Sequence, residues 1–295
     1  MHTVILFAGL ATMALGAAAP RQTPEQAWAA SIAAQNKNYA EAPHAMLKIQ
    51  DSVYLGEGEA AVLQGRKGEP ASWRWSRDAK AQGALAVAIK GGKPLVTRNG
   101  KALDPGLIAK SIAVDADVDI AGQPTQVGAG IEGWRLFVYN QKNPDARDFA
   151  GVSYFPYDLA WRVTARFKPD AALPPRVINT SRGTSQQFYH AGDASFTLEG
   201  KPFTLPFYAE SNDPGRIDSI SAFYTDGLTG KGAYGAGRYL DVKDFGAFPP
   251  KAVTIDFNRA FNPNCARSAH FTCPVTVDNI ALAIKAGERD PHAAH

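Results

Sequence analysis

Hydrophobic and polar positions alternate along most of the chain, which is the pattern of half-buried strands. Residues 161–167, WRVTARF, switch between apolar and polar at every position, as a strand with one buried face does. Similar runs, separated by Gly, Pro, Asn and Asp, occupy residues 73–75, 85–89, 112–120, 135–139, 195–198, 217–223 and 253–257. Short strands at this spacing predict a mainly β protein, an antiparallel β-barrel or sandwich.

One segment near the N-terminus has helical signals instead. The stretch 23–26, TPEQ, combines a capping Thr23, a proline at the first helical position and a glutamine three residues after the cap. This capping box predicts a short helix that ends near Asn36. Trp28 and Ile32 are one turn apart on it and are expected to anchor the helix on the rest of the protein.

The strand pattern is interrupted by Pro and Ala at residues 170–175. We therefore expect a β-rich half with the helix at 20–170, a second β-rich half at 171–288, and a polar tail at 289–295. Two predicted hairpins, at 95–103 and 196–205, both carry a Gly-Lys turn. Two similar halves or a common turn type would each explain this likeness.

An apolar run at residues 3–15 is followed by small residues at 17–19 and by Pro20. This order predicts a secretory signal peptide over residues 1–19, although no Lys or Arg precedes the run. The run is too short to cross a bilayer core of about 30 Å. We therefore expect a periplasmic or secreted protein with no stable membrane anchor after cleavage.

The composition limits the classes of partner. Hydrophobic residues make up 45% of the chain, enough for a sizeable core, and the formal net charge is +3. No block of basic residues occurs, so nothing supports nucleic-acid binding. A small-molecule ligand remains the expected partner.

Nucleotide motifs and the common hydrolase motifs are not supported. Residues 128–133 match the Gly-x-Gly-x-x-Gly spacing, but the strand-like stretch 134–139 follows where a phosphate-binding helix is needed. Residues 227–232 lack the Ser or Thr that a phosphate loop carries after its lysine. Neither Gly-x-Ser-x-Gly nor His-Glu-x-x-His occurs. The sequence predicts no cofactor and does not decide whether the protein is an enzyme.

Cys265 and Cys273 are the only cysteines in the chain. In an exported protein, two cysteines with none left over most simply form a disulfide that closes a short loop. A zinc site would need four ligands, and only His270 lies between the thiols, so no metal site is predicted. A reactive thiol with His270 as its base is the third alternative.

The C-terminal third contains a series of polar motifs. In chain order these are YGAGRYL at 234–240, DFNRAFNPNC at 256–265, TCP at 272–274 and AGE at 286–288. Over residues 154–288 the chain resembles the bacterial family catalogued as domain of unknown function 1684. Upstream, the stretches that contain Arg135 and Arg147 fit the Arg-containing middle section of that family. The chain departs from the family pattern at Ala233 and Asn264, and the resemblance implies no known activity.

These motifs supply the candidate site residues. Two acidic and two basic residues can form two ion pairs, either around a pocket or as a lock for the loop: Asp226, Asp256, Arg238 and Arg259. Asparagines in turns usually bond backbone, and Gly235 and Gly237 indicate a strand bulge or the close approach of a backbone or ligand. The ligand-binding candidates are Arg135, Arg147, Tyr234, Arg238, Asn258, Arg259 and Asn262.

Two functions are consistent with these residues. The first is a cell-envelope protein that binds a small apolar or anionic ligand in an interior lined by aromatic and basic residues, with candidates Trp161, Arg162, Arg166, Tyr234 and Arg238. The second is an envelope hydrolase in which Asp226, Asp256 or His270 acts in catalysis and Arg238 or Arg259 stabilises an anion. Binding is favoured because no pair of nucleophile and base is recognisable.

Overall fold

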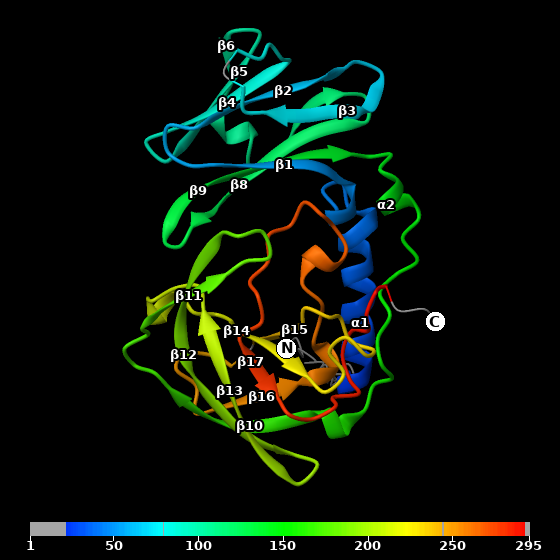
Figure 1. Cartoon of the computed structure of the whole chain (residues 1–295), viewed down its shortest axis with the longest axis vertical. Helices are drawn as coiled ribbons and strands as arrows, with labels where there is room; N and C mark the ends of the chain where they lie inside the picture. The colour runs from blue at the N-terminus through cyan, green and yellow to red at the C-terminus, as the bar shows by residue number, and fades with distance from the viewer. Residues whose placement is uncertain (1–21, 79, 244, 293–295) are drawn as a thin grey trace, which may run out of the picture.

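The computed structural model describes residues 22–78, 80–243 and 245–292, so the predicted signal peptide at 1–19 lies outside the described residues. The chain is mainly β, with antiparallel sheets and one N-terminal helix, which confirms the predicted fold class. Its strands form two lobes that lie one above the other along the longest axis (Figure 1). We call them the N-terminal lobe, strands β1 to β9, and the C-terminal lobe, strands β10 to β17.

The N-terminal lobe packs two antiparallel sheets around one apolar core. The first sheet has the order β1 (Ile49–Leu55), β9 (Ile131–Asn140), β8 (Val118–Gly128), β7 (Ile112–Asp115). The second has the order β3 (Glu69–Ser76), β2 (Ala60–Arg66), β4 (Leu85–Lys90), β5 (Lys93–Arg98), β6 (Lys101–Ala102). Leu55, Leu63 and Leu136, from both sheets, are fully buried in the shared core, as the alternation of apolar residues requires.

The C-terminal lobe is one eight-stranded sheet that curls into an open barrel. Its path is β15 (Arg238–Val242), β14 (Ile220–Asp226), β13 (Lys201–Ala209), β12 (Ser185–Leu198), β10 (Arg162–Pro169), β16 (Ala252–Asp256). Beside this path, β11 (Pro175–Asn179) pairs with β12, and β17 (Asp278–Ile280) pairs with β14 in parallel. The predicted strand at 161–167 corresponds to β10, in which Ala165 and Phe167 are buried in the barrel core.

The strands change sheets between β9 and β10, before the division that the sequence suggested at residue 170. β10 pairs with β12 and β16, so it is part of the C-terminal sheet. Whether the halves 20–170 and 171–288 fold as units stays a prediction.

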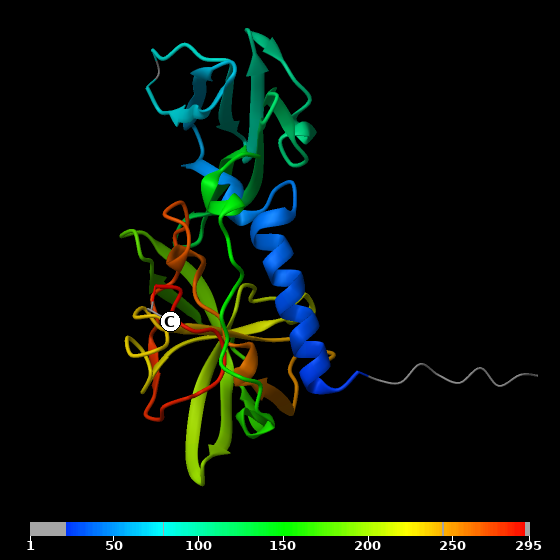
Figure 2. The ribbon, with the colours of Figure 1, turned by 90° about the vertical axis from the view of Figure 1, so that its right-hand side faces the viewer.

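Helix α1 (Pro24–Asn36) has the predicted capping box, in which the Gln26 amide donates to Thr23 Oγ1 at 3.2 Å and the Thr23 amide to Gln26 Oε1 at 2.9 Å. Trp28 anchors it by donating from Nε1 to the carbonyl oxygen of Asn258 at 2.8 Å. The helix lies beside the C-terminal lobe and points toward the N-terminal lobe (Figure 2). The other helical pieces are a π-helical turn at Lys37–Glu41, α2 (Pro144–Arg147), and 3₁₀ turns at Met46–Lys48, Pro105–Leu107, Leu159–Trp161, Pro214–Arg216, Phe257–Arg259 and Asn264–Ala266. Of the helices in the described ranges, none is both long and apolar enough to cross a bilayer.

Candidate functional site

Asp226 and Arg238 form one of the predicted ion pairs, deep inside the C-terminal lobe. Arg238 is fully buried and donates to the carbonyl oxygens of Ile284, at 3.0 Å, and Ala286. Asp226 Oδ1 accepts a hydrogen bond from the Leu228 amide at 2.7 Å. The pair therefore fastens the segment after β17 to β14 and β15, and neither residue lines any of the three best-defined cavities among the described residues.

Asn258 and Asn262 are buried and hold backbone, as asparagines in turns often do. Asn258 Nδ2 donates to the Asp158 carbonyl oxygen and to Asp256 Oδ1, each at 2.9 Å. The Asn262 amide donates to Glu288 Oε2 at 2.9 Å, and Asn262 Nδ2 to the Arg289 carbonyl oxygen at 2.8 Å. The side-chain nitrogens of both asparagines are thus engaged within the fold, whereas Asn262 Oδ1 is buried without a hydrogen-bond partner among the described residues.

Asp256 and Arg259 form the second predicted pair, and Arg162 joins them. Asp256 Oδ2 lies 3.6 Å from Arg259 Nε and 3.8 Å from Arg162 Nε. All three residues line a cavity of about 670 Å³ at the edge of the C-terminal sheet. These are the sequence candidates for anion binding that the structure does bring together.

The remaining arginine and tyrosine candidates are dispersed. Arg147 is exposed at the end of α2 and pairs with Asp148 at 2.7 Å. Tyr234 is half-buried, with its ring centroid 6.3 Å from that of His292. Trp161 is buried in the barrel core and Arg166 is exposed on β10.

Both cysteines lie in a segment that we call the cysteine loop, residues 264–274. The two are free thiols, so the disulfide predicted from the sequence is not formed in the structure. They are adjacent, because the Cys265 amide donates to Cys273 Sγ at 3.3 Å. The side-chain hydrogen bond from Cys273 lowers the pKa of Cys265 to about 6, whereas that bond and burial raise the pKa of Cys273.

The cysteine loop rises between the two lobes, as the orange segment of Figure 1 shows, and contacts both. The carbonyl oxygen of His270 accepts hydrogen bonds from Ser52 Oγ of β1, at 3.2 Å, and from Arg135 of β9. On the other side, Arg182 Nε donates to the Phe271 carbonyl oxygen at 3.1 Å. The backbone of the loop is therefore held at the junction by side chains from each lobe.

Arg135 holds this loop and is largely enclosed. Its guanidinium carbon lies 4.3 Å from the ring centroid of Phe271, 4.4 Å from that of Phe137 and 5.1 Å from that of Tyr54. Burial lowers the pKa of Arg135, and stacking on aromatic faces compensates part of that desolvation. Its position indicates a role in positioning the loop.

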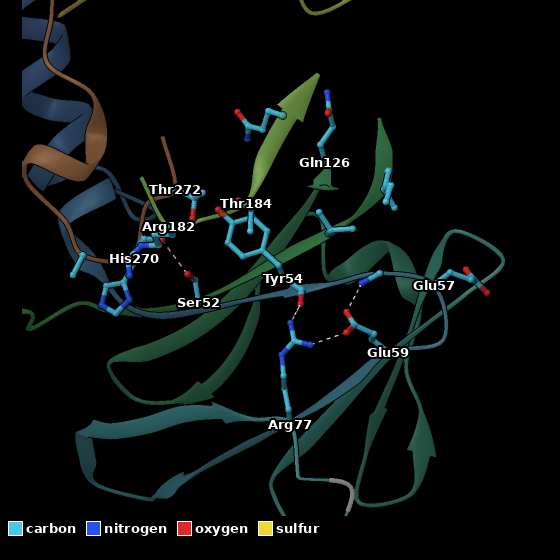
Figure 3. Close-up of a pocket in the computed structure, with 15 residues that line it drawn as sticks. Ser52, Tyr54, Glu57, Glu59, Arg77, Gln126, Arg182, Thr184, His270 and Thr272 are labelled. Atoms are coloured by element: carbon cyan, nitrogen blue, oxygen red, sulfur yellow. Dashed lines mark hydrogen bonds and ion pairs between the residues drawn. The ribbon is translucent and has the colours of Figure 1, made fainter. Parts of the chain in front are cut away.

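A cavity of about 790 Å³ opens beside the cysteine loop, between the lobes; we call it the inter-lobe cavity (Figure 3). Residues of both lobes and of the loop line it. They are Ser52, Tyr54, Gly56, Glu57, Glu59, Arg77, Gln126, Val127, Ile131, Arg182, Thr184, Gln186, Ala269, His270 and Thr272.

The acidic residues of this cavity are occupied by other groups. Glu57 accepts hydrogen bonds from the amides of Gly91 and Gly92, each at 2.9 Å, which hold its pKa below the usual range. Hydrogen bonds from the Gly56 amide and from Arg77 likewise lower the pKa of Glu59. Arg77 and Glu59 also form an ion pair at 2.8 Å. Figure 3 shows Arg77 reaching toward both Glu59 and the backbone of Tyr54.

His270 and Arg182, which also line this cavity, differ in charge. Burial lowers the pKa of His270, so its imidazole is neutral at pH 7. Arg182 is exposed and has no acidic partner among the described residues. The cavity thus has one cationic position that no carboxylate neutralises.

Of the inter-lobe cavity residues, only His270 was a site candidate from the sequence. Four other lining residues lie in strand and turn sequence that has no motif: Ser52, Tyr54, Arg182 and Thr184. They are far from His270 along the chain, so the sequence did not indicate that they lie near it. Within the described residues, no group of three His, Cys, Asp or Glu side chains has an arrangement that could hold a metal ion.

Comparison with known proteins places the C-terminal motifs in a family. No curated protein matches the chain. Among solved structures, it is similar to an uncharacterized protein from gene locus rrnAC0354 of Haloarcula marismortui, solved by solution NMR, with 29% identity and a TM-score of 0.42. That match covers 51% of this chain and 83% of the other. Residues 147–289 match the model of the family described as protein of unknown function, DUF1684. These residues, a little under half of the chain, belong to the DUF1684 family.

Proposed function

We propose that this protein binds a small organic ligand in the inter-lobe cavity. The observation that carries the proposal is that both lobes and the cysteine loop line one cavity of about 790 Å³. Small-molecule sites typically have volumes of about 300–1,000 Å³ and often lie where two structural units meet.

The lining indicates a ligand with an apolar body and a polar or anionic end. Tyr54, Val127 and Ile131 supply apolar surface, and Ile131 is 60% exposed although it is a large aliphatic residue. Thr184 and Thr272 supply hydroxyl groups, and Arg182 supplies a guanidinium that matches a carboxylate or similar anion. A few directed polar groups on an apolar wall would fix the orientation of such a ligand.

Binding is better supported than the hydrolase alternative. Asp226 is locked in the buried pair with Arg238, and Asp256 Oδ1 already accepts hydrogen bonds from the amide and Nδ2 of Asn258. His270 lines the cavity, but the two hydroxyls that bond it meet its backbone: Ser52 Oγ donates to its carbonyl oxygen, and Ser268 Oγ accepts from its amide. This arrangement differs from a nucleophile paired with a base.

The binding is proposed to take place in the cell envelope, after removal of residues 1–19. The apolar run at 3–15 and the small residues before Pro20 support export. N-terminal sequencing of protein recovered from the host envelope is expected to begin near Pro20. An intact N-terminus at Met1 would contradict export by this route.

A fluorescence titration with 8-anilinonaphthalene-1-sulfonate tests the site, because this probe has an apolar aromatic body and one anionic group. We expect saturable binding with one probe per chain. Ala269→Trp, which places an indole in the cavity from an exposed loop position, is expected to weaken binding about tenfold or more by filling the space.

The matched control is Ala171→Trp, at an exposed loop position outside the lining of the inter-lobe cavity. It adds the same indole and should leave the affinity unchanged. Near-ultraviolet circular dichroism must show native packing in all three proteins, since loosely folded proteins also bind this probe. Equal affinity in Ala269→Trp and Ala171→Trp would exclude the inter-lobe cavity as the site.

A further inference from the structure

A second cavity lies where the sheet of the C-terminal lobe stays open. Strands β15 and β16 are the two ends of the curled sheet. Tyr239 of β15 and Phe261, which follows β16, exchange backbone hydrogen bonds of 2.8 and 2.9 Å and form a bridge. Beside this bridge, residues of both edge strands line the cavity of about 670 Å³, which we call the seam cavity.

Among the described residues that line the seam cavity, basic side chains outnumber acidic ones. Its described lining includes three basic side chains, Arg162, Lys243 and Arg259, and two acidic ones, Asp241 and Asp256. Arg162 faces Asp256 across the β10–β16 pairing, and Arg259 follows in the 3₁₀ turn after β16. The basic groups therefore come from three separate places in the sequence and meet at one opening.

The two guanidinium groups are held loosely. Their Nε atoms lie 3.8 and 3.6 Å from Asp256 Oδ2, longer than the roughly 2.7–3.2 Å of a hydrogen bond. No described residue accepts a hydrogen bond from the side chain of Arg162 or Arg259. Their side chains are 39% and 40% exposed, and both residues line the cavity.

The acidic groups are more firmly engaged. Asp256 Oδ1 accepts from the Asn258 amide at 3.1 Å and from Asn258 Nδ2 at 2.9 Å, which fixes the carboxylate in place. Asp241 Oδ1 accepts from Ser221 Oγ at 2.7 Å. Asp256 thus sets the spacing of the two arginines and leaves most of their donors unused.

We propose that the seam cavity is an anion-binding site, in which Arg162 and Arg259 hold the oxygens of a carboxylate or a phosphate monoester and Lys243 adds a third positive charge. Guanidinium forks match the paired oxygens of both groups. The site is separate from the inter-lobe cavity, with which it shares no lining residue. It is therefore independent of the function proposed above.

The simpler alternative is a cluster of solvated surface ion pairs, which contribute little to stability or binding. Such a cluster would attract anions only through its general field, which salt screens. At a specific site, anion binding saturates at constant ionic strength and depends on particular arginines. The experiment is designed around this difference.

The experiment is a titration of the full chain with inorganic phosphate and, separately, with acetate, at ionic strength held constant with sodium chloride. Nuclear magnetic resonance signals of the arginine Nε–H groups report the contact directly. We expect saturable shifts of two arginine signals, and Arg162→Gln is expected to weaken binding about tenfold, because a charge-assisted hydrogen bond is lost. Saturation by phosphate alone or by acetate alone would support the site and identify its class of anion.

The matched control is Arg166→Gln, since Arg166 is exposed on the same strand and outside the cavity lining. It removes the same charge and should leave the affinity unchanged. Lys243→Gln, at an exposed position, provides a second test if Arg162→Gln unfolds. The proposal is overturned if neither anion saturates, or if Arg166→Gln weakens binding as much as Arg162→Gln. Binding of the fluorescent sulfonate to the inter-lobe cavity should persist in Arg162→Gln, so the two proposals can fail separately.

Discussion

At the scale of single residues, several polar side chains that the motifs singled out stabilise the fold. Arg238 is buried against Asp226 and two carbonyl oxygens, and Asn258 bonds backbone on both sides of its turn. Removing one partner of such a pair leaves a buried charge without compensation. The loss of stability is then larger than the stability that the intact pair contributes. Residue type in a motif therefore did not distinguish ligand contacts from structural ones.

The cysteine pair leads to a prediction about pH. The pKa of Cys265 is lowered to about 6 and that of Cys273 is raised, and only the thiolate attacks an alkylating reagent. In protein kept reduced, the rate of Cys265 alkylation by iodoacetamide should rise as pH increases through about 6 and then level off. Cys273 should react much more slowly across the same range.

Peptide mass spectrometry of samples quenched at each pH measures both rates. The control is Cys265→Ser, in which the only remaining thiol is Cys273 and labelling should stay slow. Equal rates for the two cysteines, both rising only toward pH 9, would contradict the assigned hydrogen bond.

At the scale of elements, the sequence predicted those features that depend on residues close together in the chain. The alternation in β10 follows from one buried and one exposed face, and the capping box of α1 is satisfied by atoms three residues apart. Strand partners depend on distant residues, and so the open seam between β15 and β16 was not predictable. Gly235 and Gly237, just before β15, were partly predictable. The sequence indicated either a strand bulge or the close approach of another group, but did not decide between them.

Gly237 shows that a close approach is the reason at that position. Its φ is +85°, and a Cβ there would lie 2.4 Å from Thr276 Cγ2 and 2.6 Å from the Tyr224 carbonyl oxygen. Gly237→Ala is expected to lower the free energy of unfolding by about 2–4 kcal/mol, since strain and overlap with backbone add. Urea denaturation measures the change.

Gly235→Ala is the matched control, because nothing lies within 4 Å of a Cβ at that position. Its effect should stay within about 0.5 kcal/mol of zero. If both variants unfold at the same urea concentration as the parent, this result would contradict the close packing of Gly237 against β14 and Thr276.

At the scale of the whole molecule, the candidate site exists only because the lobes meet. Gln126 of β8 donates to the Gln187 carbonyl oxygen of β12 at 2.9 Å and accepts from the Gln187 amide at 2.8 Å. The cysteine loop makes the second connection, through His270, to β1 and β9. The inter-lobe cavity lies at this junction, and its residues come from five separate stretches of chain. No local pattern predicts such a meeting, which is why His270 alone among its residues was a site candidate.

The most direct test of the account is hydrogen exchange of backbone amides, followed by mass spectrometry, with and without saturating 8-anilinonaphthalene-1-sulfonate. We expect the probe to slow exchange in peptides from three regions at once: residues 52–57 of the N-terminal lobe, 182–186 of the C-terminal lobe, and 269–272 of the cysteine loop. Joint protection would place the probe between the lobes. Protection confined to one lobe, or located away from these three segments, would contradict a ligand site at the junction.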